Sequence, residues 1–422
     1  MAFKIISVVG ARPNFMKVAA VCEAIKEHNR QGRSPSIDHV LVHTGQHYDA
    51  NMSDLFFNDL ELPKPNLFLG VGSGSHSTQT AKVMEGFEKV LLAERPHVVL
   101  VVGDVNSTVA CALVTKKTYC PGDTGGEFIP RLAHVEAGLR SFDRTMPEEV
   151  NRIVTDALSD YLFTTEESGN QNLKREGVSA DKIHFVGNVM IDTLLRYRAK
   201  AKESTILNDL QLNEEARIKS YAILTLHRPA NVDDAGTFSK IIESFLDISR
   251  HMPLIFPAHP RTLKQIQEAD LGDYFVDHFM EGPEPWDSRV RIRLVPPLGY
   301  LDFLHLMSCA KVVLTDSGGI QEETTILGVP CITLRENTER PVTLTHGTNV
   351  LVGADSEKII EEFARVLRGV RAPASPPQFW DGNAARRIIQ ILIDDQTPAR
   401  QVDLSDWRSG AELPATFDTP DS

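Results

Sequence analysis

The sequence lacks the features that mark secreted, membrane-spanning and zinc-binding proteins. It has five cysteines, an odd number, and none stands in a CxxC pair. This pattern predicts buried free thiols in a reducing compartment, and neither a disulfide framework nor a zinc site. No apolar run approaches the roughly 18 residues that cross a bilayer, and the first residues lack the long apolar region of a signal peptide. We therefore expect a cytoplasmic protein without membrane association.

Basic charge is also scarce, because 44 lysines and arginines face 57 aspartates and glutamates, for a net charge of −13. Such a chain is poorly suited to a nucleic-acid backbone or an anionic membrane as its main partner, although a local cluster of cations still suits a small anion. The sequence has neither GxxxxGK[ST] nor GxGxxG after a strand, which disfavours ATP and NAD. His39, His43 and His47 share a spacing of four that forms one face only on a helix, so we expect no metal.

What the chain does contain is a regular alternation of short apolar runs and helix-period segments. Continuous apolar strands indicate that both faces of a sheet are covered, which is typical of parallel α/β proteins. The expected strands are residues 4–9, 39–45, 97–103, 131–135, 161–165 and 183–187 in the first half, and 221–226, 253–258, 291–295, 311–316 and 330–334 in the second.

These runs predict two doubly wound domains, of residues 1–200 and 201–380. A helix over residues 381–396 is expected to close on either domain, and residues 397–422, rich in Pro, Asp, Ser and Thr, are expected to form a mobile tail. Open α/β sheets bind ligands beyond the carboxyl ends of their strands. Because charged or turn-forming residues follow strands in both halves, we expect one cleft between two facing domains.

The stretch LTDSGGIQEE (314–323) carries the strongest local signal. Ser317, Gly318 and Gly319 turn a strand directly into a helix, whose first amides and dipole suit a phosphate. Glu323, one turn later, is placed to bind the hydroxyls of a sugar. The alternative is an ordinary strand-to-helix turn, but Arg340 after the next strand favours a phosphate site.

Two turns in the first half carry further charged residues. Arg12 and Lys17 follow the first strand, where two cations suit a pyrophosphate, although Pro13 is equally typical of a plain helix start. Asp104 ends another strand. We expect Asn106 or Ser107 to cap the helix that follows it. In the second half His227 ends a strand beside Arg228, at the edge of the expected cleft.

The stretch HVEAGLRSFDRTMPEEVNR (134–152) gathers acids and arginines around Glu136, which closes a strand. Pro147 suits the first position of the next helix. Glu148 and Glu149 occupy its first turn, where the helix dipole favours carboxylates, and this compensation alone suffices for Glu149. The 3.6-residue period predicts the buried face of this helix, formed by Val150, Ile153, Val154, Ala157 and Leu158.

Taken together, these stretches resemble the non-hydrolysing UDP-N-acetylglucosamine 2-epimerases. The resemblance is carried in order along residues 10–341 by GARPNFMK, TGQHYD, VVGDVNST, HVEAGLRSFDRTMPEEVNR, FVGNVMIDTL, LHRPAN, HPRT, LTDSGGIQEE and TERP. It implies a GT-B fold, which consists of two Rossmann-like domains facing a cleft, and a homodimer. It also implies interconversion of UDP-N-acetylglucosamine and UDP-N-acetylmannosamine without a cofactor, by anti elimination of UDP to a 2-acetamidoglucal and re-addition.

The resemblance also implies roles for individual residues. It assigns UDP binding to Arg12, His227, Phe303, Ser317, Gly318, Gly319, Glu323 and Arg340, and the chemical step to Lys17, Asp104, Glu136 and Glu148, with His227 as a further catalytic residue. The sequence departs from many bacterial members in lacking the arginines that help to bind a second, activating substrate molecule, so we expect no such activation. The segment at residues 121–130 is longer than the usual connector.

Three other functions remain open on the sequence. A GT-B glycosyltransferase uses the same nucleotide site but needs an acceptor. An epimerase of a modified sugar, such as a 2,3-diacetamido uronic acid, fits the same motifs. A non-catalytic UDP-sugar sensor is disfavoured, because a sensor has no use for the retained carboxylates.

Overall fold

The computed structural model describes residues 3–46, 59–122, 126–214, 217–258, 260–277, 292–370, 375–395 and 401–402. The expectation for His47 and most of the predicted tail lie outside these residues. In the described part of the chain, we find no helix with both the length and the apolar character needed to span a bilayer. All five cysteines are free thiols, as predicted; four of them are buried, whereas Cys309 is only partly buried.

The first half forms a seven-stranded parallel sheet, and every strand predicted there is present. The central strand β4 is a run of valine and leucine that is buried throughout, because helices cover both sides of the sheet. In spatial order the strands are β3 (Leu67–Phe68), β2 (Ile37–His43), β1 (Phe3–Val9), β4 (Val98–Val102), β7 (Arg131–Ala137), β8 (Tyr161–Thr164) and β9 (Ile183–Phe185). The helices are α1 (Arg12–Arg30), α3 (His76–Glu94), α4 (Asn106–Lys117), α5 (Pro147–Leu158) and α6 (Glu167–Arg175).

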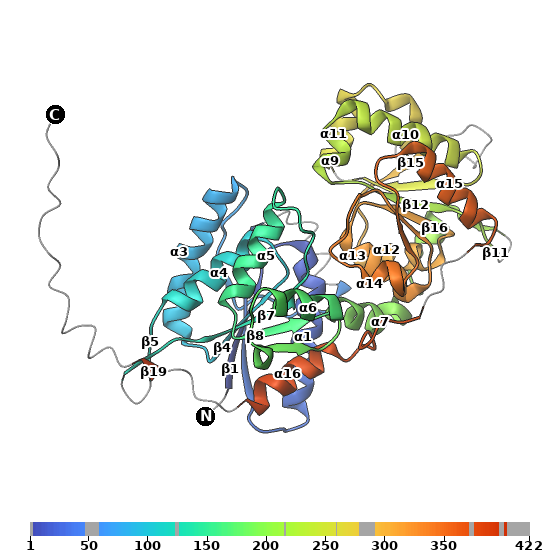
Figure 1. Ribbon diagram of the computed structural model, residues 1–422. Helices are drawn as coiled ribbons and strands as arrows, with labels where there is room; N and C mark the ends of the chain where they lie inside the picture. The colour runs from blue at the N-terminus through green and yellow to red at the C-terminus, as the bar shows by residue number, and fades with distance from the viewer. Residues whose placement is uncertain are drawn as a thin grey trace, which may run out of the picture.

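The second half repeats this architecture in a separate lobe, shown in yellow and orange in Figure 1. Its parallel sheet also has seven strands, of which the short edge strands β14 and β18 were not predicted. The order is β14 (Phe275–Asp277), β15 (Ile292–Val295), β13 (Leu254–Pro257), β12 (Ala222–Thr225), β16 (Val312–Thr315), β17 (Cys331–Thr333) and β18 (Asn349–Leu351). The helices are α9 (Pro229–Val232), α10 (Ala235–Ser249), α11 (Pro260–Glu268), α12 (Tyr300–Cys309), α13 (Gly318–Leu327), α14 (Val342–Thr345) and α15 (Ser356–Leu367).

Helix α7 (Val189–Ala201) joins the two lobes. It packs against α1 in the first lobe and against α12 and α13 in the second. The short helix α8 (Ile206–Asp209) continues this contact with α12. Buried apolar side chains from both lobes, such as Leu194 and Leu304, belong to one continuous cluster. The lobes therefore share a core at this joint, and the cleft opens beside it.

The last helix, α16 (Ala384–Asp394), returns to the first lobe, where it packs against α1 and α7 (Figure 1). The Asp192 carboxylate accepts hydrogen bonds from the amides of Ala384 at 3.1 Å and Ala385 at 2.7 Å. Trp380, just before α16, donates its indole N–H to the carbonyl of Thr165 at 2.9 Å. These contacts decide between the two placements that the sequence left open.

The long connector at 121–130 contributes to a small three-stranded sheet. Its order is β19 (Gln401–Val402), β6 (Glu127–Phe128) and β5 (Cys120–Pro121), and its strands are antiparallel. The connector thus pairs with a segment from the far end of the chain. A second short hairpin, β10 (Asn213–Glu214) with β11 (Arg217–Ile218), follows α8.

The segment that precedes α16 packs against Gly187, the residue two positions before α7. This contact can be tested by its effect on stability. Gly187 has a φ of +90°, and a Cβ there would lie 2.0 Å from the carbonyl oxygen of Phe379. Gly177 is a matched control, because its φ is +83° but a Cβ there would meet nothing within 4 Å. We expect Gly177→Ala to lower the free energy of unfolding by about 1–2 kcal/mol, the cost of left-handed backbone for an L-residue.

Gly187→Ala should lose a further ~1–3 kcal/mol, because the added methyl group overpacks the contact with Phe379. Urea denaturation of both variants measures the difference. Equal losses would show that the chain before α16 does not press on Gly187.

Candidate functional site

A cavity of about 360 Å³ lies between the lobes at the carboxyl ends of strands from both sheets. Most of the predicted site residues line it: Lys17, Asp104, Glu148, His227, Phe303, Ser317, Gly318, Gly319, Glu323 and Arg340. Glu136 does not line the cavity but contacts both Lys17 and Arg340. Arg12 begins α1, and its side chain lies outside the described residues. The structure therefore brings residues from distant parts of the sequence to one place.

Glu136 occupies a strained position at the end of β7. Its φ is +74°, and the pairing of β7 with β8 shifts register between Val135 and Ala137. A non-glycine residue in this conformation costs about 1–3 kcal/mol, and such strain and such bulges concentrate at functional sites. The buried carboxylate pairs with the Lys17 ammonium and, at 2.6 Å, with Nη2 of Arg340. Burial opposes its charge, yet Lys17 and Arg340 lower the pKa of Glu136 to about 2. Glu136 is therefore ionised.

Arg340 is the cation at the centre of the cleft. Besides Glu136, its Nε lies 2.7 Å from Oε1 of Glu322, as an ion pair without hydrogen-bond geometry, and its Nη1 lies 3.5 Å from Oε2 of Glu339. Burial opposes the charge of Arg340, but these carboxylates outweigh it and raise its pKa. The guanidinium thus stays charged in a buried place.

The first turn of α13 lies against this guanidinium. A Cβ on Gly318 would be 2.5 Å from Nη1 of Arg340, so only glycine allows the approach. The N-cap residue Ser317 makes no side-chain capping bond. A helix N-terminus without a side-chain cap, beside a buried arginine, is a suitable site for a phosphate.

His227 stands at the cavity edge and is held by a buried aspartate. Its Nδ1 lies 2.9 Å from Oδ1 of Asp316, whose carboxylate also accepts hydrogen bonds from the amide of Arg228 at 2.9 Å and from Asn231 at 3.2 Å. Burial opposes the charge of Asp316, but the hydrogen bond and charge of His227 lower its pKa. Because the carboxylate needs a proton donor, Nδ1 carries the hydrogen and Nε2 is left for a ligand.

The predicted buried face of α5 is wrong. Val150 is 47% exposed, whereas the buried residues of α5 are Glu149, Arg152, Thr155 and Asp156. The helix turns its polar side inward, because these side chains bind backbone and charges around the cavity. Its apolar stripe has the same period, so the sequence pattern alone pointed to the opposite side.

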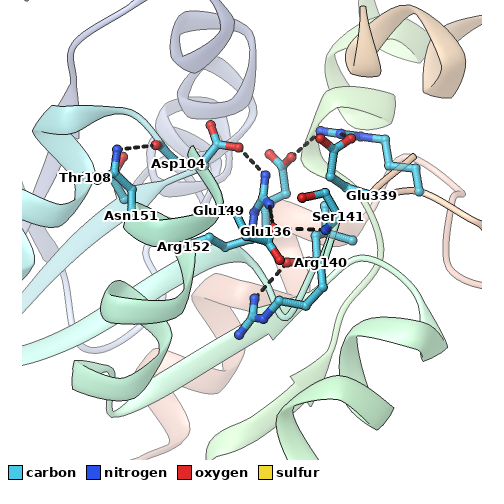
Figure 2. Close-up of polar contacts among 12 residues, drawn as sticks. Asp104, Thr108, Glu136, Arg140, Ser141, Glu149, Asn151, Arg152 and Glu339 are labelled. Carbon is cyan, nitrogen blue, oxygen red and sulfur yellow. Dashed lines mark hydrogen bonds and ion pairs between the residues drawn. The ribbon is translucent and has the colours of Figure 1, made fainter. Parts of the chain in front are cut away.

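The interpretation of Glu149 as dipole compensation is also wrong. Its carboxylate is buried and accepts hydrogen bonds from the amides of Ser141 at 2.9 Å and Phe142 at 3.0 Å. Arg152, which sequence reasoning missed, places its guanidinium between Glu149 and Asp104 (Figure 2). Glu149 and Arg152 therefore fix the loop before α5 and hold Asp104 in place.

The predicted caps of α4 are not formed. The N-cap is Val105, and no side chain caps the helix. Instead Asn106 donates to Oε1 of Gln79 at 2.9 Å, while the hydroxyl of Ser107 donates to Oε1 of Gln46 at 2.7 Å. These buried bonds hold the turn that carries Asp104.

A second missed group, His134 with Asp156, links the loop that carries Asp104 to the loop that follows Glu136. His134 places Nε2 2.8 Å from the carbonyl of Gly103 and Nδ1 2.6 Å from Oδ1 of Asp156. Oδ2 of Asp156 accepts the amide of Gly138 at 3.0 Å and pairs with Arg140 at 2.7 Å. The only sequence signal was a histidine between the apolar residues Ala133 and Val135 of a strand.

Glu323 lies at the other end of the cavity as a neutral acid. Burial, and then the charge of Glu322, raise the pKa of Glu323 to about 8, and the hydroxyl of Tyr300 donates to its Oε1 at 3.3 Å. The cavity thus combines a cationic part, at Arg340 and Lys17, with carboxylates that face it. Within the described ranges, no three histidine, cysteine or acidic side chains form a group that suits a metal ion.

Comparison with known proteins gives one consistent result. The sequence profile of a family described as UDP-N-acetylglucosamine 2-epimerase matches residues 29–393. The chain is 40% identical over 395 residues to the UDP-N-acetylglucosamine 2-epimerase of Methanocaldococcus jannaschii, covering 92% of this chain and 98% of that one. It is 38% identical over 392 residues to the UDP-2,3-diacetamido-2,3-dideoxy-D-glucuronate 2-epimerase of Pseudomonas aeruginosa, covering 92% and 99%.

The crystal structure of the Methanocaldococcus jannaschii UDP-GlcNAc 2-epimerase in complex with UDP-GlcNAc and UDP superposes with a TM-score of 0.78 at 40% identity, covering 92% of this chain and 99% of that one. Together with the two parallel sheets, this confirms the predicted GT-B fold.

The His134–Asp156 contact gives a pH-dependent prediction. Burial opposes the charge of Asp156, but His134 and Arg140 outweigh it and hold its pKa below the ordinary value. A carboxyl with a lowered folded-state pKa contributes stability above its unfolded pKa, about 3.9, and loses it as the pH falls through the folded value. We expect Asp156→Asn to cost about 3–5 kcal/mol of unfolding free energy at pH 7, because it leaves buried cations without their partner.

The difference between the wild type and Asp156→Asn should shrink as the pH falls below about 4. Urea denaturation at several pH values measures it. Glu176→Gln is the control, because Glu176 pairs with the same Arg140 but its side chain is 38% exposed. That change should cost no more than ~1 kcal/mol. A constant Asp156→Asn difference down to pH 3 would contradict the assignment.

Proposed function

The chain belongs to the UDP-N-acetylglucosamine 2-epimerase family, and we propose that it interconverts UDP-N-acetylglucosamine and UDP-N-acetylmannosamine by inverting carbon 2 without a cofactor. Membership makes it an isomerase. The specific proposal rests on the ion pair between Arg340 and Glu136. Arg340 lies on the second lobe, beside the first turn of α13 that suits a phosphate, and Glu136 lies on the first lobe, near the other carboxylates. One cavity therefore has both a binding site for a leaving diphosphate and carboxylates that can accept or donate a proton.

The diphosphate is bound in this proposal by Arg340, the first turn of α13 and His227. Preorganised donors of this kind contribute roughly 3–4 kcal/mol each to a charged transition state. Nη1 of Arg340 already lies beside Gly318, and His227 as an imidazolium donates from Nε2 to the diphosphate while Nδ1 stays on Asp316. Lys17 lies across the cavity on α1, where its charge adds to the same site.

The reaction begins when the bond between the anomeric carbon and the diphosphate oxygen breaks, with its electron pair leaving on UDP. Positive charge on the ring acidifies the hydrogen on carbon 2. A carboxylate takes that proton, and the C–H electron pair forms the double bond of a 2-acetamidoglucal. UDP then returns to carbon 1, and an acid delivers a proton to the opposite face of carbon 2, which gives the epimer.

Asp104, Glu136 and Glu148 are the carboxylates for these steps, and general acid–base catalysis of this type gives about 10²–10⁴-fold. Their environments differ. Glu136 is buried and held ionised, so it is suited to stabilise ring charge or to accept a proton. Asp104 is held by Arg152, whereas Glu148 is exposed on the first turn of α5. Glu148 is therefore placed to exchange protons with water.

A second candidate substrate is a 2,3-diacetamido uronic acid, because a relative at 38% identity is named for it. The sugar carboxylate of such a substrate needs a cation. On the acidic side of the cavity Arg152 is engaged by Asp104 and Glu149, and Lys17 by Glu136. This pairing favours a neutral sugar over a uronate.

Incubation of the purified protein with UDP-N-acetylglucosamine alone in deuterated water tests the proposal. We expect deuterium at carbon 2 and formation of UDP-N-acetylmannosamine, because elimination exchanges the proton without any acceptor. Mass spectrometry and proton NMR follow both. A glycosyltransferase or a sensor would leave the sugar unlabelled, and exchange in the UDP-linked diacetamido uronate alone would establish the second candidate.

Glu136→Gln separates chemistry from binding. We expect turnover to fall by about 10²–10⁴-fold, because the variant cannot carry charge or accept a proton. The affinity for UDP should stay equal or increase, because Arg340 loses a competing carboxylate. Isothermal titration with UDP and steady-state kinetics measure the two effects.

Glu61→Gln is the matched control, because Glu61 pairs with Lys200 away from the cavity and its side chain is 61% exposed. It should leave both quantities unchanged. Near-normal turnover of Glu136→Gln would remove Glu136 from the mechanism, and weakened UDP binding would show that its main task is structural.

A further inference from the structure

Behind Arg340 lies a group of buried acidic atoms that the proposed chemistry does not use. Glu322, on α13 of the second lobe, is 1% exposed, and Glu166, just after β8 of the first lobe, is 2% exposed. Neither oxygen of Glu322 has a hydrogen-bond partner among the described residues, nor does Oε2 of Glu166. A buried carboxylate without hydrogen bonds is costly, and protonation is the usual way to lower that cost.

The positive charge available to these two acids is limited. Arg340 is shared between Glu322 and Glu136, while Glu136 has Lys17 as a second partner. In the described part of the chain, no cation forms an ion pair with Glu166. Its Oε1 accepts a hydrogen bond from the hydroxyl of Ser168.

Glu339, the third acid near Arg340, has a partner of its own. Arg335 donates two hydrogen bonds to it, at 2.8 and 2.9 Å. The two buried acids without sufficient compensation are therefore Glu322, on the second lobe, and Glu166, on the first.

The pKa shifts of both acids agree with this shortage of positive charge. Burial raises the pKa of Glu166 to about 7, and the charge of Glu322 adds to the shift against the opposing effects of Ser168, Arg340 and the Val342 amide. Burial also raises the pKa of Glu322, together with the charge of Glu136 and against Arg340 and Lys17.

We propose that Glu166 and Glu322 form a carboxyl pair across the lobe boundary that takes up a proton when a nucleoside diphosphate binds to Arg340. The inference rests on the proposed function, because it places the diphosphate at Nη1 of Arg340 beside Gly318. A diphosphate there shares the guanidinium and adds negative charge close to Glu322. Since like charges repel strongly in a buried place, a solvent proton converts one carboxylate of the pair to a neutral carboxylic acid.

The pair therefore makes Glu322 and Glu166 positioning residues, which set how much of the charge of Arg340 is available to a ligand. The linkage between proton uptake and UDP binding gives the direction in which affinity changes with pH. If binding takes up a proton, affinity is highest where the pair is already protonated and falls as the pH rises through its titration. For one linked proton the fall approaches about tenfold per pH unit.

Glu323 also titrates near neutrality, so the test must separate it from the pair. Its pKa is raised to about 8 by burial and by Glu322, and it shares a hydrogen bond with Tyr300. Glu323 lines the cavity, whereas Glu166 and Glu322 do not. Glu166→Gln separates the pair from Glu323, because Glu166 neither lines the cavity nor contributes to the raised pKa of Glu323, whereas Glu322 contributes to it.

Isothermal titration of UDP at pH 8, in two buffers of different ionisation enthalpy, counts the protons taken up. At this pH the terminal phosphate of UDP is itself ionised, because its second pKa is about 6. We expect the wild type to take up roughly one proton per UDP, and the affinity to fall between pH 7 and 9. Glu322→Gln should remove the uptake and flatten the pH dependence.

Glu166→Gln, on the other lobe, should reduce the uptake in the same way and serves if Glu322→Gln does not fold. Asp192→Asn is the control: Asp192 is a partly buried acid whose pKa burial raises to about 6, and it binds the first amides of α16 away from the cleft. It should leave proton uptake unchanged. UDP binding without proton uptake, or uptake that persists in both glutamine variants, would overturn this inference alone. A wild type that binds no UDP would overturn the proposed function as well.

Discussion

The buried ion pair between Arg340 and Glu136 is the interaction on which the rest of the site depends. It joins two side chains 204 residues apart in the sequence and on different lobes, with 2.6 Å between nitrogen and oxygen. Because it lies where the carboxyl ends of both sheets meet, it fixes which parts of the lobes face each other. The first turn of α13 and the acids around β7 therefore meet at one cavity.

Keeping this pair buried constrains its surroundings. Charges removed from water are tolerated only where partners and hydrogen bonds compensate them. This explains why α5 turns its polar side inward and why Arg152, Glu149 and Asp104 form a chain of alternating charge (Figure 2). The same requirement explains the strained backbone at Glu136, where a bulge aims the carboxylate at two cations.

A layer of buried aspartates supports these charged side chains from behind. Asp316 orients His227, and Asp156 ties the loop of Glu136, through the Gly138 amide, to the histidine that binds the Gly103 carbonyl. Both aspartates follow or face strand ends, so they are anchored on rigid elements. Helix α7 adds an apolar core that both lobes share, and this core fixes the position of one lobe relative to the other.

The sequence by itself determined most strands of the two large sheets, the two halves, and the gathering of most predicted site residues at one cavity. Apolar runs and turn residues are local features, and the carboxyl ends of parallel strands always meet at one edge. Only the tertiary structure decided which side of α5 is buried, where α16 packs, and that Arg152, His134, Asp156, Glu166 and Glu322 are buried at or behind the cavity. Each of these depends on a partner distant in the sequence. A helical period shows that a helix has two different faces, but it does not show which face packs against the rest of the protein.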